Sequence, residues 1–305
     1  MSNESLTSEQ SLAANGKSFH WARRFLGARM GNDAARLYAF CRLLDDMADG
    51  DIENGPARLR AIRDDLAAGR PGDDPALQAF LPLMAEKRFP AEVLVALIDG
   101  LLEDQLDMVA LADEAALLRY AYRVAGTVGL LMCHVLDCHA PAARAHAIDL
   151  GIAMQLTNIA RDVLEDADMN RRYIPGDWVG GATPADILAA AQAPGSDVHA
   201  DVTNAVARLL DIAETFYASG AQGYRYLPWR AHLSIAIAAR VYRQIGVQLL
   251  ATGCAWHQGR QVTSGTTKLR CSAVALASLG TRFGAAEGCH DQRLHLALRG
   301  LPYVA

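Results

Sequence analysis

Residues 151–175, GIAMQLTNIARDVLEDADMNRRYIP, combine an apolar and a polar helical face, and this combination decides the fold. The apolar face begins just before this stretch and recurs at helical spacing, at Ile148, Ile152, Leu156, Ile159 and Val163. The neighbouring face is polar and consists of Gln155, Asn158, Asp162 and Asp166. Such a pattern predicts a core helix whose polar edge borders an interior cavity.

A second acidic cluster lies about a hundred residues earlier, in residues 36–50, RLYAFCRLLDDMADG. Asp45 and Asp49 are four residues apart, as are Asp162 and Asp166, so each pair shares one helical face. Solvated acidic helix surfaces are the alternative. We favour a site, because carboxylates beside a cavity are costly unless a cation neutralises them. Two such faces would bind Mg²⁺, with Mn²⁺ as the alternative, and through it a diphosphate.

Cationic and amide side chains accompany both acidic clusters. Arg42 lies one turn before Asp45, while Arg161 and Arg171 flank the second cluster. These arginines could form ordinary helical salt bridges, or their guanidinium groups could grip a diphosphate. Their recurrence at both clusters favours the second interpretation. Gln155 and Asn158 could offer amide oxygens to a cation.

Composition narrows the class of protein. The chain has 305 residues, is 51% hydrophobic and 21% charged, and carries a net charge of −5, which argues against nucleic acid as a partner. Six scattered cysteines and an N-terminus without an apolar signal segment predict a cytoplasmic protein. No stretch reaches the roughly 18 apolar residues of a membrane span, which leaves peripheral membrane contact open.

Helical periodicity recurs along the whole chain and strand-like alternation is scarce, which predicts a single all-α domain over residues 1–305 with a flexible N-terminus over 1–12. Asn32, Asp113 and Thr183 are predicted N-caps. Gly126 and Gly129 interrupt an apolar helical stretch, which predicts a kink or a close helix approach there. The predicted helices span 11–29, 32–49, 56–68, 75–85, 90–110, 113–137, 141–166, 184–193, 199–222, 230–252 and 266–282.

Six segments together resemble the squalene/phytoene synthases, which join two prenyl diphosphates head to head. The chain is most similar to the bacterial phytoene synthases of that family. The segments occur in the family's order and are KSFHWARRF (17–25), LYAFCRLLDDMAD (37–49), YRVAGTVG (122–129), QLTNIARDVLED (155–166), NRRYIP (170–175) and AARVYRQIG (238–246).

The resemblance implies a helical isoprenoid synthase fold around a central active-site cavity, and it assigns roles to matching residues. Mg²⁺ would be bound by Asp45, Asp49, Asn158, Asp162 and Asp166, and the four aspartates would also be catalytic. Tyr122 is the implied catalytic tyrosine that assists proton removal, with the released diphosphate as the alternative base. The implied substrate-binding residues are Lys17, Ser18, Phe19, Arg42, Gln155, Asn158, Arg161, Arg171 and Tyr242.

The implied activity is condensation of two geranylgeranyl diphosphates to phytoene, through a cyclopropyl diphosphate, in carotenoid biosynthesis and without NADPH. The small residues Ala34 and Ala35 before the first acidic cluster leave room for twenty-carbon tails. The alternative is a squalene, dehydrosqualene or presqualene diphosphate synthase that uses farnesyl diphosphate. Two further alternatives are more remote. A non-catalytic assembly factor with the same fold would be expected to have lost these carboxylates. A di-iron helical bundle would need two Glu-x-x-His pairs, which this sequence lacks.

Overall fold

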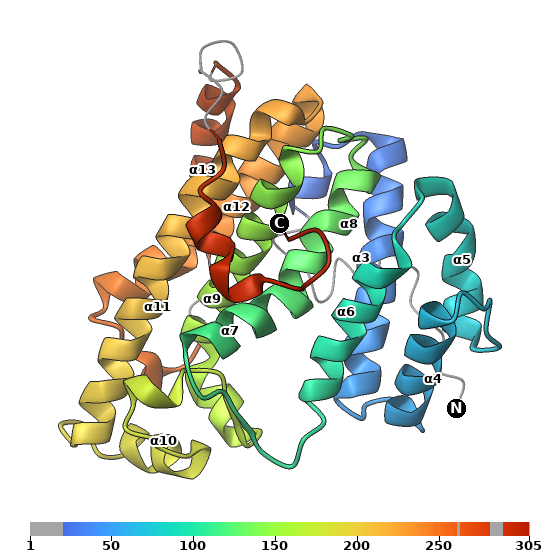
Figure 1. Ribbon diagram of the computed structural model, residues 1–305. Coiled ribbons are helices and arrows are strands. Elements are labelled where there is room, and N and C mark those ends of the chain that lie inside the picture. Colours follow the sequence, from blue (N-terminus) through green and yellow to red (C-terminus); the bar gives the residue numbers. More distant parts are fainter. Residues whose placement is uncertain (1–20, 261–262, 281–288, 305) are drawn as a thin grey trace.

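The computed structural model describes residues 21–260, 263–280 and 289–304. The N-terminus expected to be flexible, and the predicted substrate-binding residues Lys17, Ser18 and Phe19, lie outside the described residues. The described chain is almost entirely helical, which confirms the all-α prediction (Figure 1).

The helices follow one another through short connections. They are α3 (Ala28–Ala48), α4 (Gly55–Ala67), α5 (Pro75–Lys87), α6 (Ala91–Glu103), α7 (Glu114–Ala121), the π-helical η1 (Tyr122–Gly126), α8 (Thr127–Val135), α9 (Ala143–Asp168), α10 (Pro184–Ala191), α11 (Asp197–Gln222), α12 (Trp229–Ala251) and α13 (Gly265–Ser278). Short 3₁₀ segments are η2 (Gly176–Trp178), η3 (Gly223–Tyr226), η4 (Trp256–Gln258) and η6 (Gln292–Leu298).

Helix α9 is the centre of the molecule. It packs against α11 and α12 on one side and against η1 and α8 on the other (Figure 1). The apolar face predicted from the sequence is buried as expected: Ile148, Ile152 and Leu156 are fully inaccessible to solvent. Burying a large apolar side chain contributes about 1.5–3 kcal/mol of transfer free energy. This face is therefore the main stabilising contact of the helix.

Two predicted helix boundaries are wrong. The helix predicted over 90–110 ends at Glu103, and residues 109–110 instead form the short strand β1 (Val109–Ala110), which pairs in parallel with β2 (Arg171–Arg172). The break predicted between 29 and 32 lies instead at Gly27, whose φ of 80° suits glycine alone. Asn32 is therefore inside α3 and is not an N-cap, whereas Asp113 and Thr183 do cap their helices.

The helix predicted over 113–137 is divided by the π-helical turn η1. Just beyond it, α8 crosses α9 so closely that a Cβ on Gly129 would lie 2.1 Å from the carbonyl oxygen of Ala147. A Cβ on Gly151 would likewise lie 2.3 Å from the carbonyl oxygen of Ala125. The predicted close approach is confirmed, since only glycine fits at these crossings.

The C-terminal segment, residues 289–304, passes across α7 and returns toward α8 (Figure 1, red). The guanidinium group of Arg119 holds it there, donating to the carbonyl oxygens of Ala297 at 3.0 Å and Arg299 at 3.1 Å. The segment thereby becomes part of the core, in which Leu298 is fully buried.

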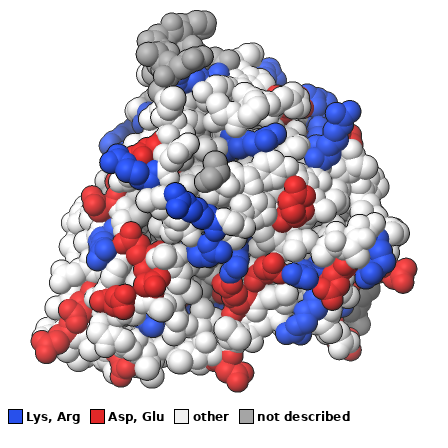
Figure 2. Space-filling model, in the orientation of Figure 1, with Lys and Arg blue, Asp and Glu red and all other residues white. Residues whose placement is uncertain are grey.

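Basic and acidic side chains alternate over the face shown in Figure 2 and do not gather into one area of a single sign. Across the described residues, no helix combines the length and the apolar character that crossing a bilayer requires.

Candidate active site

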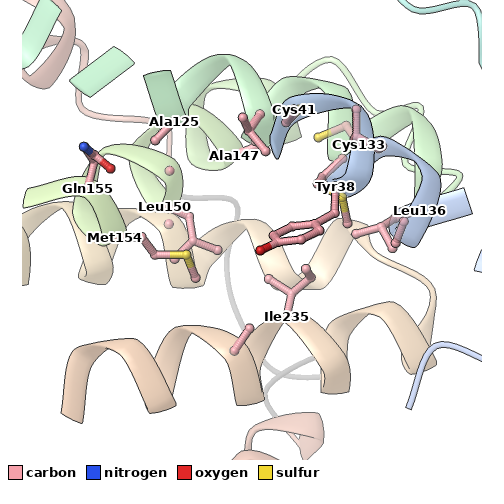
Figure 3. A pocket seen from close by; sticks show the side chains of 18 of the residues that line it. Tyr38, Cys41, Ala125, Cys133, Leu136, Ala147, Leu150, Met154, Gln155 and Ile235 are labelled. Atoms are coloured by element: carbon pink, nitrogen blue, oxygen red, sulfur yellow. The ribbon is translucent and has the colours of Figure 1, made fainter. Parts of the chain in front are cut away.

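A cavity of about 440 Å³ opens between α3, α6, α8, α9 and α12. Its walls are mainly apolar, with Leu37, Leu101 and Val128 among the lining residues. Figure 3 shows Leu150 and Met154 between the polar Gln155 at one end and Leu136 with Cys133 at the other. The cavity therefore has a polar end near the acidic helix segments and an apolar interior.

The first acidic cluster lies at the polar end, on the last turns of α3. Asp45 lines the cavity, and its carboxylate accepts a hydrogen bond from the Arg42 guanidinium at 2.8 Å. Arg42 also forms an ion pair with Asp46 one turn further along the helix. Both interpretations of Arg42 from the sequence are thus compatible with its position: it forms helical ion pairs, and it also faces the cavity.

The second acidic cluster occupies the last turns of α9. The Nε of Arg161 donates to Asp162 at 2.6 Å, and Arg260, from the segment after η4, lies 3.1 Å from the same carboxylate. Arg161 and Asp162 are each less than a fifth exposed, so this network is largely shielded from solvent.

Arg171 connects the chain after α9 to the first acidic cluster. It sits on β2, immediately after α9, yet its guanidinium donates to Asp49 of α3 at 2.8 Å. The pairing of β2 with β1 places Arg171 there, because it fixes the chain beside the end of α6. The same guanidinium donates to the backbone carbonyl of Asp104 at 3.3 Å. The chain that follows the second acidic segment therefore lies against the end of the first.

Negative charge accumulates at this end of the cavity. Burial raises the pKa of Asp45 to about 6; Arg42 opposes the shift, and Asp49 and Asp46 add to it. Burial and the Asp162 carboxylate raise the pKa of Asp166 to about 8, although Arg171 opposes the shift. Without a metal ion these two carboxyl groups therefore hold protons more tightly than free ones do, and a bound cation would displace those protons.

Two amide side chains also lie at the cavity. Gln155 and Asn158 both line the cavity, and the Asn158 amide group donates to the Gln155 carbonyl oxygen at 3.4 Å. The side-chain oxygen of Asn158 is buried and has no hydrogen-bond partner among the described residues, so it can accept a metal ion or a donor. Tyr242 lines the same cavity and interacts electrostatically with Arg161.

The structure does not bring Tyr122 to the cavity. Its ring is fully buried, and its hydroxyl donates to the carbonyl oxygen of Pro302 in the C-terminal segment. Tyr120 lines the cavity instead. Two residues apart on a helix means roughly 200° of rotation, so only one of the two tyrosines can face the cavity.

The Tyr120 hydroxyl donates to the Asp104 carboxylate at 2.9 Å, and the Tyr173 hydroxyl donates to its other oxygen at 2.7 Å. Asp104 lines the cavity and contributes to the raised pKa values of both Asp45 and Asp166. Burial likewise raises the pKa of Asp104 itself, against the hydrogen bonds from the two tyrosines. This carboxylate therefore lies between the two acidic clusters.

Sequence reasoning missed four residues of the site, namely Asp104, Tyr120, Tyr173 and Arg260. Extending the predicted helix to residue 110 obscured the position of Asp104 at the end of α6. The pattern RYAYRVAG contains both tyrosines, and only the phase of α7 distinguishes them. Arg260 had no detectable signal, because its contact with Asp162 spans 98 positions.

Comparison with known proteins places these observations in a family. The family model described as squalene/phytoene synthase matches residues 12–267. The 15-cis-phytoene synthase of Paracoccus sp. (strain N81106 / MBIC 01143) is 36% identical over 88% of this chain and 90% of its own length. The phytoene synthase of Rhodobacter capsulatus is 37% identical over 76% of this chain and 69% of its own length.

Among solved structures, a dehydrosqualene synthase in complex with a ligand is similar with a TM-score of 0.77 and 26% identity. The match covers 90% of this chain and 95% of the other. The fold, the order of the motifs and the match over most of the chain agree with the resemblance found in the sequence. The chain belongs to the squalene/phytoene synthase family.

Proposed function

We propose that the protein is a prenyltransferase that condenses two molecules of geranylgeranyl diphosphate head to head to form phytoene, as a step of carotenoid biosynthesis. One observation supports this proposal: carboxylates and arginines cluster at the polar end of a cavity that has apolar walls. The curated relatives at 36% and 37% identity are named phytoene synthases, which supports this product.

The donor set fits the Mg²⁺ that the family implies. The unpartnered buried oxygen of Asn158 and the raised pKa values of Asp45 and Asp166 are what a bound hard cation would correct. Asp45, Asp49, Asn158, Asp162 and Asp166 would hold the ion. When bound, it would neutralise the diphosphate leaving group.

The arginines would share that task. Arg42, Arg161 and Arg171 now pair with carboxylates, and guanidinium groups in such a position can turn to the oxygens of a diphosphate. Neutralising the leaving group lets the allylic C–O bond of one substrate ionise. The double bond of the second substrate then attacks the allylic cation, and loss of a proton closes a cyclopropane ring.

A second ionisation, rearrangement and proton loss complete phytoene, so that two diphosphates and two protons are released in total. No electron pair is needed from outside, and no nicotinamide cofactor enters the balance. The apolar walls exclude water, which would otherwise capture the cations.

We propose Tyr120, in place of Tyr122, as the tyrosine beside the reacting carbons. Tyr120 lines the cavity and its hydroxyl is hydrogen-bonded to Asp104, so a proton taken from a carbocation could be relayed toward the carboxylate network. The released diphosphate is the alternative proton acceptor.

The second candidate is dehydrosqualene formation from farnesyl diphosphate, which the likeness to a solved dehydrosqualene synthase favours. Purified protein incubated with Mg²⁺ and each diphosphate, with and without NADPH, separates the candidates by product chromatography. We expect a forty-carbon product from geranylgeranyl diphosphate that does not depend on NADPH. Turnover of the fifteen-carbon substrate alone would refute the phytoene assignment.

We further propose peripheral membrane contact at the mouth, in a protein that acts in the cytoplasm. Leu106, Met108 and Met169 are each about half exposed or more, and they follow the acidic ends of α6 and α9. A hydrocarbon product gains free energy by entering a bilayer directly. Liposome co-sedimentation should weaken when Leu106 and Met108 are replaced by serine; unchanged sedimentation would exclude this contact.

A further inference from the structure

A second cluster of potential metal ligands lies where the C-terminal segment meets α9. Asp149 of α9 is completely buried. The Nε2 atom of His295 lies 2.7 Å from one of its carboxylate oxygens, and the Nε2 atom of His290 lies 2.7 Å from the other. Two histidines from one short segment thus converge on one carboxylate.

This cluster is separate from the acidic site at the cavity mouth. Asp149 and Asp162 are on the same helix, and a rise of about 1.5 Å per residue places them about 20 Å apart along its axis. Any ion bound at Asp149 would therefore be too far away to touch a diphosphate held near Asp162.

The chemistry of the donors suits a borderline divalent ion better than Mg²⁺. Two imidazole nitrogens and one carboxylate form the three-ligand set that proteins use for Zn²⁺, whereas Mg²⁺ prefers oxygen alone. The ligand atoms of Asp149, His290 and His295 all lie within 4.8 Å of one another. Ligands bound tetrahedrally to Zn²⁺ lie roughly 3.3 Å apart. To admit the ion, each 2.7 Å N–O contact would lengthen by about 0.6 Å, and the widest separation in the cluster would shorten by at most about 1.5 Å.

The surroundings orient the carboxylate as the support of a metal ligand would. The Ser219 hydroxyl of α11 donates to Asp149, and the His146 Nδ1 lies 3.3 Å from that hydroxyl. Asp149 is thereby held by side chains from two other elements, Ser219 of α11 and the two histidines of the C-terminal segment.

We propose that Asp149, His290 and His295 form a Zn²⁺ site that fastens the C-terminal segment to α9. Neutral histidines and an ionised carboxylate leave a net charge of +1 with the ion bound, and a water molecule can complete the tetrahedron.

The fastened segment packs behind the wall of the cavity. Its Pro302 carbonyl accepts the Tyr122 hydroxyl, and the Arg144 guanidinium lies 4.9 Å from the Tyr303 ring centroid. The ring of His146, which lines the cavity, packs edge-on at 5.3 Å against His290. The ion would thus stabilise the wall around the buried tails of the substrate.

The test uses the full-length protein after treatment with a chelator, and its readouts do not depend on catalysis. Titration with Zn²⁺ should show one tight equivalent and raise the Tm. Co²⁺ should give the visible absorption of a tetrahedral N/O site without a thiolate charge-transfer band. Both signals should be lost in His295→Gln and in His290→Gln. Of the two, His290→Gln should disturb the fold less, because the His290 side chain is 13% exposed.

Three control variants separate this site from other sources of binding. His199→Gln alters a distant histidine pair, in which the ring nitrogens of His199 and His257 lie 3.1 Å apart, and should leave the Zn²⁺ signal intact. Cys289→Ser removes the exposed thiol beside His290 and should likewise leave the signal intact. Asp45→Asn alters the proposed Mg²⁺ site and should retain Zn²⁺ binding even if it abolishes turnover.

Binding that persists in a His290→Gln/His295→Gln double variant, or no Zn²⁺ or Co²⁺ equivalent at all in the folded wild type, would overturn the proposal. If no metal ion binds, the cluster is only a buried aspartate that is hydrogen-bonded to two histidines. Circular dichroism of each variant without metal checks that it has folded.

Discussion

Asp104 is the residue on which the two sides of the site converge, since it receives the hydroxyl groups of Tyr120 and Tyr173 and a backbone contact from Arg171. Charged hydrogen bonds of this kind contribute about 1.5–3 kcal/mol each. They hold Asp104 at the cavity wall and fix the direction of the Tyr120 hydroxyl. The chemistry of the site therefore depends on single hydroxyl groups.

The two tyrosines of RYAYRVAG give a matched pair of variants. Tyr120→Phe removes a hydroxyl at the cavity, and because positioned proton transfer contributes about 10²–10⁴-fold, we expect kcat to fall at least tenfold. Tyr122→Phe removes only the contact with Pro302, at a cost of about 1 kcal/mol in unfolding free energy. Steady-state kinetics and thermal unfolding of both variants measure this; equal loss of kcat in both would contradict it.

Stability without divalent cations should depend on pH through Asp166. Its folded-state pKa of about 8 exceeds the unfolded value of 3.8, so the folded state binds the proton more tightly between these values. The contribution to stability is complete below about pH 4 and is lost as the pH rises toward 8. Asp45, with a pKa of about 6, acts in the same direction at lower pH.

We therefore expect that Asp166→Asn in chelator-treated protein raises the Tm at pH 8 by about 2 °C or more and flattens its decline between pH 5 and 8. Turnover should be lost, because the proposed metal ligand is gone. Differential scanning calorimetry across this pH range is the measurement. A steeper decline in the variant would mean that Asp166 is not protonated in the folded protein.

At the scale of elements, the crossing of α8 and α9 fixes the wall of the cavity, and glycine makes it close. Gly129 lies against the backbone of Ala147, and Gly151 against that of Ala125. Helix α9 can approach α8 and η1 this closely only because glycine occupies one side of each contact. The π-helical turn η1 just before it shifts the phase of the chain between Tyr120 and α8.

Gly129→Ala tests this crossing. The new methyl group would lie 2.1 Å from a backbone oxygen, so α8 must move, and we expect a loss of about 1–3 kcal/mol or more in unfolding free energy. Gly265→Ala at the start of α13, where a Cβ meets nothing within 4 Å, is the control and should change stability by less than about 1 kcal/mol. Chemical denaturation measures both; equal effects would refute the close-packing argument.

At the scale of the whole molecule, substrate length is a property of the cavity. It collects residues from α3, α6, α8, α9, α11 and α12, and Ala34 of α3 is among those that line it. Ala35, the other small residue noted in the sequence, is fully buried. Of the two, Ala34 is therefore the residue placed to decide how much room a long tail has.

Ala34→Phe should shorten the accepted tail. Because the larger ring would occupy part of the cavity, we expect kcat/KM for geranylgeranyl diphosphate to fall tenfold or more. Activity with farnesyl diphosphate should be retained or should rise, and it serves as the internal control for folding. A parallel loss with both substrates would show that the substitution damages the fold.

How far the sequence predicted the site depends on distance along the chain. Asp45 with Arg42, and Asp162 with Arg161, are local groupings, so closeness along the chain was sufficient to predict them. The contact of Arg171 with Asp49 spans 122 positions and was expected only in general terms, as two facing segments. The contacts of Asp104 with its two tyrosines, and of Arg260 with Asp162, depend on where α6 ends and on how loops fold back.

The amino-acid sequence by itself determined the helical class, the buried face of α9, most helix positions and the two acidic motifs, because these follow from periodicity and capping within a few residues. Only the tertiary structure decided that Tyr120 and not Tyr122 faces the cavity, that Asp104 lies between the motifs, and that two C-terminal histidines meet Asp149. These outcomes depend on the rotation of one helix against another, and that rotation is set by packing across the whole core.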